Sequence, residues 1–176
     1  MSFLFEPENL LPQDGIAIYH GVVFNEQEAT LICNKLFETI PWKQDEVVMF
    51  GKKIVTKRKV AWYADAGITY TYAGVKKSGL QWNADLLEIK RKVEAITGAK
   101  YNACLLNLYH EGEEGMGWHQ DNEVEMVAGS SIASLSFGAN RKFAFKHAKT
   151  GERLDIELAH GSLLDMKGTI QQHWYH

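Results

Sequence analysis

The second half of the chain places the strongest limit on its fold. From Tyr101 to His176, short apolar or alternating stretches are separated by turn residues at close spacing. Leu154, Ile156 and Leu158 alternate with charged residues, as expected for a strand with one buried face. Many short strands with such turns are typical of a sandwich or barrel, and a jelly roll is one form that protects the sheet edges. We expect strands over 16–24, 101–109, 131–137, 141–146, 153–158, 162–166 and 172–176.

Two helices are predicted in the first half. Asn25 and Glu28 have the spacing of a helix-capping box, and Pro41 ends the helix that they begin. The second helix lies within 79–98, where an apolar stripe at helical spacing precedes Gly98, a suitable residue for the C-terminal stop.

A hairpin is predicted over 46–63, with a basic turn that carries Phe50 at or near its tip. Phe50 has two interpretations, which are packing under a neighbouring loop and insertion as a wedge into a base stack. Tyr70 and Tyr72 share a strand face, either as part of the core or as a stacking surface for a planar ligand.

Composition is that of an ordinary globular protein, and 176 residues are enough for one domain. The net charge of −3 does not by itself indicate nucleic-acid binding, although basic residues gather within 52–59 and 141–149. No apolar run approaches the roughly 20 residues of a membrane span, and the N-terminus lacks a signal-peptide pattern. Cys33 and Cys104 lie in apolar contexts typical of free buried thiols. We expect an intracellular monomer, cytoplasmic in a bacterium and nuclear in a eukaryote.

His119-Gln120-Asp121 is a candidate metal-binding motif. On or just off a strand, alternate side chains share a face, so the imidazole and the carboxylate would converge on one point. One more histidine would complete a two-histidine, one-carboxylate set, which leaves coordination positions open and is diagnostic of non-heme Fe(II) oxygenases. Mn, Co, Ni or Zn would fit the same ligands.

A set of motifs runs through the chain: Phe50-Gly51-Lys52, Asp65–Tyr72, Asn107-Leu108-Tyr109, Gly117–Glu123, Ser131–Gly138, His160–Leu164 and His173–His176. Together they resemble the AlkB family of Fe(II)- and 2-oxoglutarate-dependent dioxygenases, and most closely its branch that repairs double-stranded DNA. The resemblance implies an α+β, mainly β fold: a double-stranded β-helix (jelly roll) core with two N-terminal helices and a substrate-binding hairpin. It also implies a single domain over 1–176, with the helices and a nucleotide-recognition lid in about 1–98 and the core in 99–176.

By this resemblance, His119, Asp121 and His173 hold Fe(II), and 2-oxoglutarate and O2 take the open positions. Asn107 and Tyr109 would hydrogen-bond 2-oxoglutarate. Oxidative decarboxylation of this cosubstrate to succinate would drive hydroxylation of an N-alkyl group on a base of the 1-methyladenine or 3-methylcytosine type. The hydroxylated methyl group would then leave the base as formaldehyde. The implied substrate is alkylated DNA, double- or single-stranded, with RNA left open.

On the substrate side, the resemblance implies that Tyr72 and His119 sandwich a flipped base while Phe50 fills the gap that it leaves. Glu123 would favour a cationic base by Coulomb attraction. The remaining substrate contacts are expected from Gly51, Lys52, Arg58, Tyr70, Thr71 and Asn122.

Two alternatives to a nucleic-acid dealkylase stay open. One keeps the iron site and changes the substrate to a protein or small molecule. The other is a non-catalytic jelly-roll module with a structural metal or none, although structural sites are usually closed.

Five further histidines have no predicted ligand role. We expect structural or surface positions for His20, His110, His147 and His160, and a place just outside the metal ligands for His176. The family that the chain resembles continues beyond this segment into a strand whose arginine clamps 2-oxoglutarate. That strand is absent from the 176 residues, so we expect this form to bind the cosubstrate poorly, to be destabilised, or to need the further segment.

Overall fold

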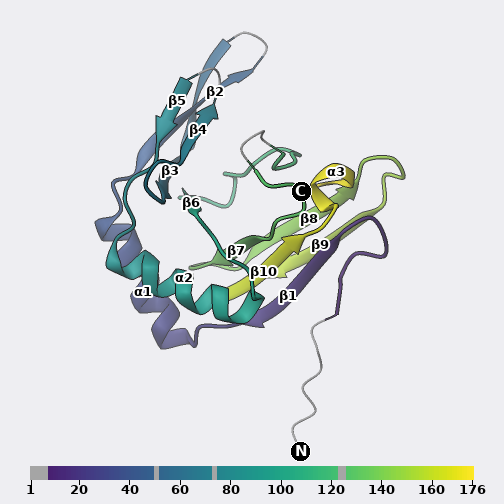
Figure 1. The fold of residues 1–176 in the computed structure, drawn as a ribbon, viewed down its shortest axis with the longest axis horizontal. Helices are drawn as coiled ribbons and strands as arrows, with labels where there is room; N and C mark the ends of the chain where they lie inside the picture. The colour runs from purple at the N-terminus through teal and green to yellow at the C-terminus, as the bar shows by residue number, and fades with distance from the viewer. Residues whose placement is uncertain (1–7, 50–51, 73–74, 123–125) are drawn as a thin grey trace, which may run out of the picture. The chain divides into compact units, whose positions relative to one another are not determined.

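The computed structural model describes residues 8–49, 52–72, 75–122 and 126–176 (Figure 1). The chain divides into two compact units, one made of Met1–Phe37 with Gly117–His176 and the other of Glu38–Met116. The strand that follows residue 98 pairs within the second unit. The two units are described separately below.

The first unit holds two antiparallel sheets of three strands each. One sheet has the order β1 (Ile16–Val22), β10 (Ser162–Lys167), β7 (Ile132–Ser136). The other has the order β11 (Trp174–Tyr175), β8 (Arg141–His147), β9 (Arg153–Leu158). β7 is an edge strand in this arrangement, since its one described partner is β10.

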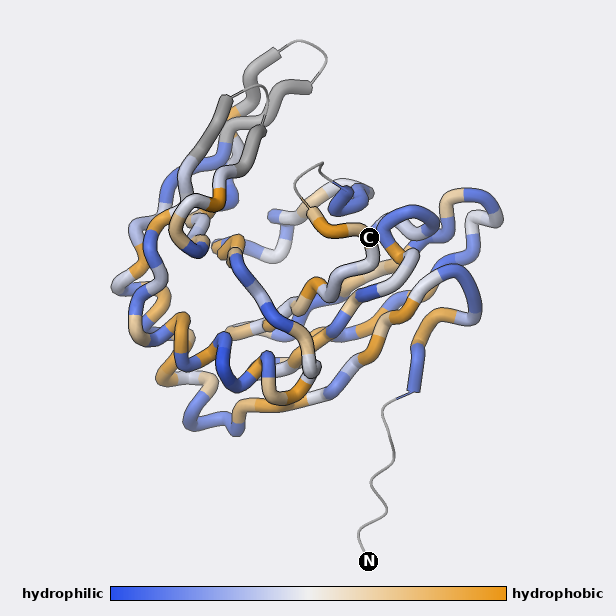
Figure 2. The backbone as a smooth tube through the Cα atoms, viewed as in Figure 1, coloured by the Kyte–Doolittle hydropathy of each residue, from blue (hydrophilic) through white to orange (hydrophobic). Residues whose placement is uncertain are grey.

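The core of this unit forms where side chains of the two sheets pack together. Leu164 and Met166 alternate along β10, and they pack in one cluster with Phe145 of β8 and Leu158 of β9. Trp174 joins this cluster with a fully buried side chain. Apolar segments can be followed along these strands in Figure 2. Of the two predicted architectures, sandwich or barrel, two packed sheets are therefore present, and β1 from the first half of the chain is part of them.

Two helices lie next to strands of these sheets in the sequence: one follows β1 and the other precedes β11. The first, α1 (Glu26–Thr39), begins with the predicted capping box: Glu28 N–H donates to Asn25 Oδ1 at 2.9 Å, and Asn25 N–H donates to Glu28 Oε2 at 3.1 Å. The second, α3 (Ile170–His173), is a single turn just before β11. The strand predicted over 172–176 is therefore wrong in its first half, because Ile170 is drawn into the core and the backbone turns there.

The second unit contains a three-stranded antiparallel sheet, β2 (Lys43–Met49), β3 (Lys52–Ala64), β6 (Ala103–Leu108), in that order. β2 and β3 pair as the predicted hairpin, whose tip lies outside the described residues. A separate two-stranded pair is formed by β4 (Thr69–Tyr72) and β5 (Val75–Ser78).

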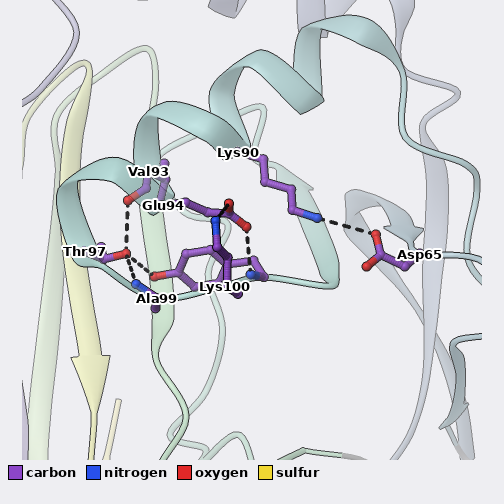
Figure 3. Close-up of polar contacts among 8 residues, drawn as sticks. Asp65, Lys90, Val93, Glu94, Thr97, Ala99 and Lys100 are labelled. Atoms are coloured by element: carbon purple, nitrogen blue, oxygen red, sulfur yellow. Dashed lines mark hydrogen bonds and ion pairs between the residues drawn. The ribbon is translucent and has the colours of Figure 1, made fainter.

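Helix α2 (Ala84–Thr97) lies within the predicted range and ends at the predicted Gly98. Asn83 Oδ1 accepts a hydrogen bond from Leu86 N–H, and Gly98 closes the helix in the left-handed region at φ 72°. Figure 3 shows the polar contacts of this helix and of the turn that follows it. In one of them, Lys90 of α2 forms an ion pair with Asp65. These contacts tie α2 to the end of β3.

All strand pairs among the described elements are antiparallel, and the fold is mainly β with three helices. Among the described residues, none of the helices has the length and apolar character needed to cross a bilayer.

Candidate metal centre

Three side chains of the first unit converge on one point. The ligand atoms of His119, Asp121 and His176 all lie within 4.8 Å of one another. His119 Nε2 lies 3.6 Å from Asp121 Oδ1, and His176 Nε2 lies 3.4 Å from Asp121 Oδ2. The convergence of His119 and Asp121 that their spacing predicts is therefore present.

Backbone hydrogen bonds join the two histidine segments. The N–H of His119 donates to the carbonyl of His176 at 3.1 Å, and the N–H of His176 donates to the carbonyl of His119 at 3.0 Å. Two residues that exchange both bonds in this way form an antiparallel pair. Their side chains start from neighbouring positions, and the ring centroids are 4.3 Å apart.

A carbonyl fixes the orientation of the His119 ring. Nδ1 lies 2.9 Å from the oxygen of Gly117. Because a carbonyl oxygen can only accept, Nδ1 carries a proton, and Nε2 is the ring nitrogen that faces Asp121. Metal-binding histidines are usually held by a carbonyl or carboxylate in this manner.

Packing holds the His176 ring. The side chain is 5% exposed and stacks on Phe143, with centroids 5.6 Å apart and an interplanar angle of 15°. Its Nδ1 is buried and has no hydrogen-bond partner among the described residues. The atom that faces the other two ligands is therefore Nε2.

The surroundings of Asp121 favour its ionised form. Burial raises the pKa of this carboxyl group, but the hydrogen bond from His176 and the charges of His176 and His119 lower it more, so the pKa lies below its ordinary value. One carboxylate and two imidazoles are a donor set that suits Fe(II) and related divalent cations.

His173, the predicted third ligand, lies elsewhere. Helix α3 ends at this residue, and its ring stacks on that of His147 with centroids 6.2 Å apart and an interplanar angle of 6°. The ligand atoms of His173 group with those of Asp14 and His147, not with His119. The geometry therefore corrects the prediction and places His176 beside His119 and Asp121.

Side-chain alternation gives the physical reason. Trp174 is fully buried, and residues two apart on a strand share a face. His176 therefore points inward with Trp174, whereas Tyr175 between them is exposed. The large apolar Trp174 was the sequence signal that could have selected His176 over His173.

The second group of candidate ligands is better explained as a structural hydrogen-bond network. His147 is 2% exposed, and its Nδ1 accepts the backbone N–H of Thr150 at 3.1 Å. Nε2 must then carry the proton of the neutral ring, and it donates to Asp14 Oδ2 at 3.1 Å. Both nitrogens are used, so His147 has no lone pair for a metal.

Asn107 and Tyr109, the residues predicted to hold 2-oxoglutarate, belong to the second unit. Asn107 is on β6, where it pairs with Val60, and Tyr109 follows the end of that strand. Asn107 is exposed and Tyr109 is half-buried. Their role in cosubstrate binding stays a prediction.

Arg58 differs most from its predicted role as a DNA contact. It is 7% exposed, and its Nη2 donates to Asp45 Oδ2 at 2.5 Å. A buried guanidinium engaged with a carboxylate is not presented to a phosphate. The geometry therefore favours a structural ion pair between β2 and β3.

The other predicted substrate contacts are described only in part. Asn122 is exposed and lines a small cavity beside Asp121. Phe50, Gly51 and Glu123 lie outside the described residues. For the following positions the structure describes the backbone alone, in β3 and β4: Lys52, Tyr70, Thr71 and Tyr72.

His160 has a structural position, as expected, and the structure shows which groups it contacts. Its Nδ1 accepts the N–H of Gly138 at 2.8 Å, so the proton lies on Nε2, which is 3.2 Å from Thr30 Oγ1 of α1. The ring therefore links the start of α1 to the turn after β7. His110 makes a local contact with Glu114 at 3.3 Å.

Comparison with known proteins decides the family. A model of the 2OG-Fe(II) oxygenase superfamily matches residues 15–176. The chain is 37% identical over 177 residues to the DNA oxidative demethylase ALKBH2 of Mus musculus, covering 94% of this chain and 74% of that protein. It is 38% identical over 174 residues to the Homo sapiens protein of the same name, covering 93% of this chain and 67% of that protein. This chain belongs to the AlkB family of 2OG-Fe(II) oxygenases.

A second human relative, the alpha-ketoglutarate-dependent dioxygenase alkB homolog 3, is 33% identical over 171 residues, covering 92% of this chain and 59% of that protein. Membership of the family makes the protein an Fe(II)- and 2-oxoglutarate-dependent dioxygenase, close to the ALKBH2 branch. The group of His119, Asp121 and His176 fits the iron, because it offers one carboxylate, one imidazole with a fixed tautomer and one imidazole held by stacking.

Proposed function

We propose that this protein removes N-alkyl groups from bases of the 1-methyladenine and 3-methylcytosine type in DNA, as a repair enzyme. The observation that carries the proposal is the convergence of His119, Asp121 and His176 in a chain that is similar to DNA oxidative demethylases over more than nine-tenths of its length. The products would be the repaired base, formaldehyde and succinate.

The ligand set is suited to this chemistry. Two imidazoles and one carboxylate would hold Fe(II) and leave coordination positions open for a chelating cosubstrate and O2. When bound there, iron supplies the oxidising power that the side chains lack. His119 and His176 would bind through Nε2 and Asp121 through a carboxylate oxygen, while Gly117 and Phe143 keep the two rings in orientation.

On the cosubstrate side, Asn107 and Tyr109 would hydrogen-bond 2-oxoglutarate. On the base side, Tyr72 and His119 would enclose the flipped base, Phe50 would fill the gap in the duplex, and Glu123 would favour a cationic lesion.

A row of basic and aromatic side chains supports nucleic acid as the substrate. Tyr175 of β11 is paired with Lys146 of β8, which is paired in turn with Arg153 of β9. Cross-strand partners project from the same face of a sheet, so the three side chains form a row. The guanidinium of Arg153 also lies 5.2 Å from the ring centroid of Trp118.

The row is next to the metal centre in the sequence, and by strand alternation Tyr175 projects from the face opposite to His176. Trp118 and Tyr175 each directly precede one of the two metal-binding histidines, and their side chains are 45% and 36% exposed. Cations that neutralise phosphates, together with aromatic rings that stack on bases, are the usual means of holding a nucleic-acid strand. We infer that the row contacts DNA outside the lesion pocket, with single strands and RNA as further substrates to be tested. A monomeric, intracellular enzyme is part of the same proposal.

Product analysis tests the function. The protein is incubated with Fe(II), 2-oxoglutarate and a duplex that carries one 1-methyladenine, and formaldehyde and succinate are measured together. We expect both products, in matching amounts, and neither with Asp121→Ala. Succinate without formaldehyde, from methylated duplex and methylated single strand alike, would contradict nucleic-acid dealkylation and favour a protein or small-molecule substrate.

A further inference from the structure

The backbone of Asp121 is held by a side chain that lies far from it in the sequence. Residues 119–122 have no helix or strand assignment, so regular hydrogen bonding does not fix the backbone of Asp121. Its N–H instead donates to Gln171 Oε1 at 2.8 Å, across 50 positions of sequence. A backbone held at this point limits the directions in which the carboxylate can point.

The hydrogen bond also fixes the orientation of the amide. An N–H group needs an acceptor, so Oε1 must face Asp121 and Nε2 must face away. Nε2 is buried and has no partner among the described residues. Gln171 and Asp121 also line a cavity of about 120 Å³.

Gln171 is itself firmly anchored. It follows Ile170, which is 1% exposed and packs in the core cluster. Gly15 approaches so closely that a Cβ on it would lie 2.9 Å from the Cα of Ile170. Trp174, on the other side of Gln171, is fully buried. The amide therefore projects from a segment with little freedom to move.

The segment from Gln171 to His176 thus holds the loop that carries His119 and Asp121 at two points. At its far end His176 exchanges both backbone hydrogen bonds with His119, and at its near end Gln171 holds the N–H of Asp121. The segment that supplies the third ligand also sets the geometry of the first two.

We propose that Gln171 is a positioning residue for the metal-binding carboxylate of Asp121. The inference rests on the proposed metal site. Partners outside the direct ligands typically change metal affinity by about 10- to 100-fold when they are removed. We expect a loss in this range for Gln171→Met, which keeps the length of the side chain and removes the acceptor oxygen.

The test is a titration of the metal-free protein with Co(II), followed by the visible absorption of the bound ion. Gln172→Met is the matched control, since it makes the same change at the exposed neighbour on α3, and it should bind as the wild type does. Gln171→Glu keeps an acceptor for the N–H, so it should restore affinity to within about threefold of wild type. The melting temperature of each metal-free variant is measured in parallel.

The outcomes are separable. If the wild type fails to bind Co(II), the proposed metal site itself is wrong. If the wild type binds and Gln171→Met binds equally well, or only melts earlier with unchanged affinity and absorption spectrum, Gln171 has no positioning role. Equal losses in Gln171→Met and Gln171→Glu would also overturn the inference. Should Gln171→Met not fold, Gln171→Asn carries the test, because its amide is one methylene too short to reach Asp121.

Discussion

Replacing His147 with alanine should separate the structural histidine network from the metal centre. The change removes the hydrogen bond from Thr150 N–H and the hydrogen bond to Asp14 Oδ2, both 3.1 Å long. Each contributes about 1 kcal/mol to stability. Asp14 is 46% exposed, so water can hydrate its carboxylate when His147 is removed. The loss of this hydrogen bond therefore costs about 1 kcal/mol and no more. The edge contact with Trp174, at 4.8 Å between centroids, adds about 1 kcal/mol.

The sum is about 3 kcal/mol of lost stability. In a chain of this length 1 kcal/mol shifts the melting temperature by about 2–4 °C, so His147→Ala should melt about 6–12 °C below wild type. Thermal unfolding in the metal-free state measures this shift. The exposed His110, replaced in the same way, is a control that should cost under about 1 kcal/mol.

The affinity of His147→Ala for Co(II) should stay within about threefold of wild type, because both ring nitrogens already serve hydrogen bonds. An unchanged melting temperature with a large loss of Co(II) affinity would refute this reasoning. It would mean that the second group of candidate ligands holds a metal.

Three further predictions address other parts of the molecule. Arg153→Glu, which leaves the metal ligands untouched, should weaken duplex binding about tenfold at low salt and flatten its salt dependence, as measured by fluorescence anisotropy; an unchanged salt slope would argue against the basic row as a DNA contact. His160→Ala leaves Gly138 N–H without its acceptor and should lower the free energy of unfolding by about 1–3 kcal/mol in urea titration, with no change expected if the link to α1 is unimportant. Asn83→Ala removes the cap of α2 and should cost about 1 kcal/mol by the same titration, whereas a stability equal to wild type would show that water caps the helix equally well.

Local signals in the sequence predicted helices α1 and α2 but not the short α3. The capping box of Asn25 and Glu28 forms as expected, and Gly98 adopts the left-handed conformation that ends α2. These features depend on residues a few positions apart, so no tertiary information is needed to see them. The alternation of Leu154, Ile156 and Leu158 likewise identified β9.

Features that depend on distant contacts were harder to predict. The third metal ligand depends on which histidine follows the inward face set by Trp174, and the motif alone offered two candidates. Arg58 stands in a basic stretch that suggested a DNA contact, but its acidic partner lies 13 positions away on the paired strand. Gln171 carried no signal at all, because its partner Asp121 is brought close only by the fold.

The central claim is that His119, Asp121 and His176 form the metal centre of this dioxygenase. The most direct measurement is the dissociation constant of Co(II) for wild type, His173→Ala and His176→Ala. Losing a direct ligand should exceed the about 10- to 100-fold effect of an outer partner, so we predict a loss of more than about 100-fold for His176→Ala. His173→Ala should bind within about threefold of wild type. Tight binding by His176→Ala together with weak binding by His173→Ala would contradict the account.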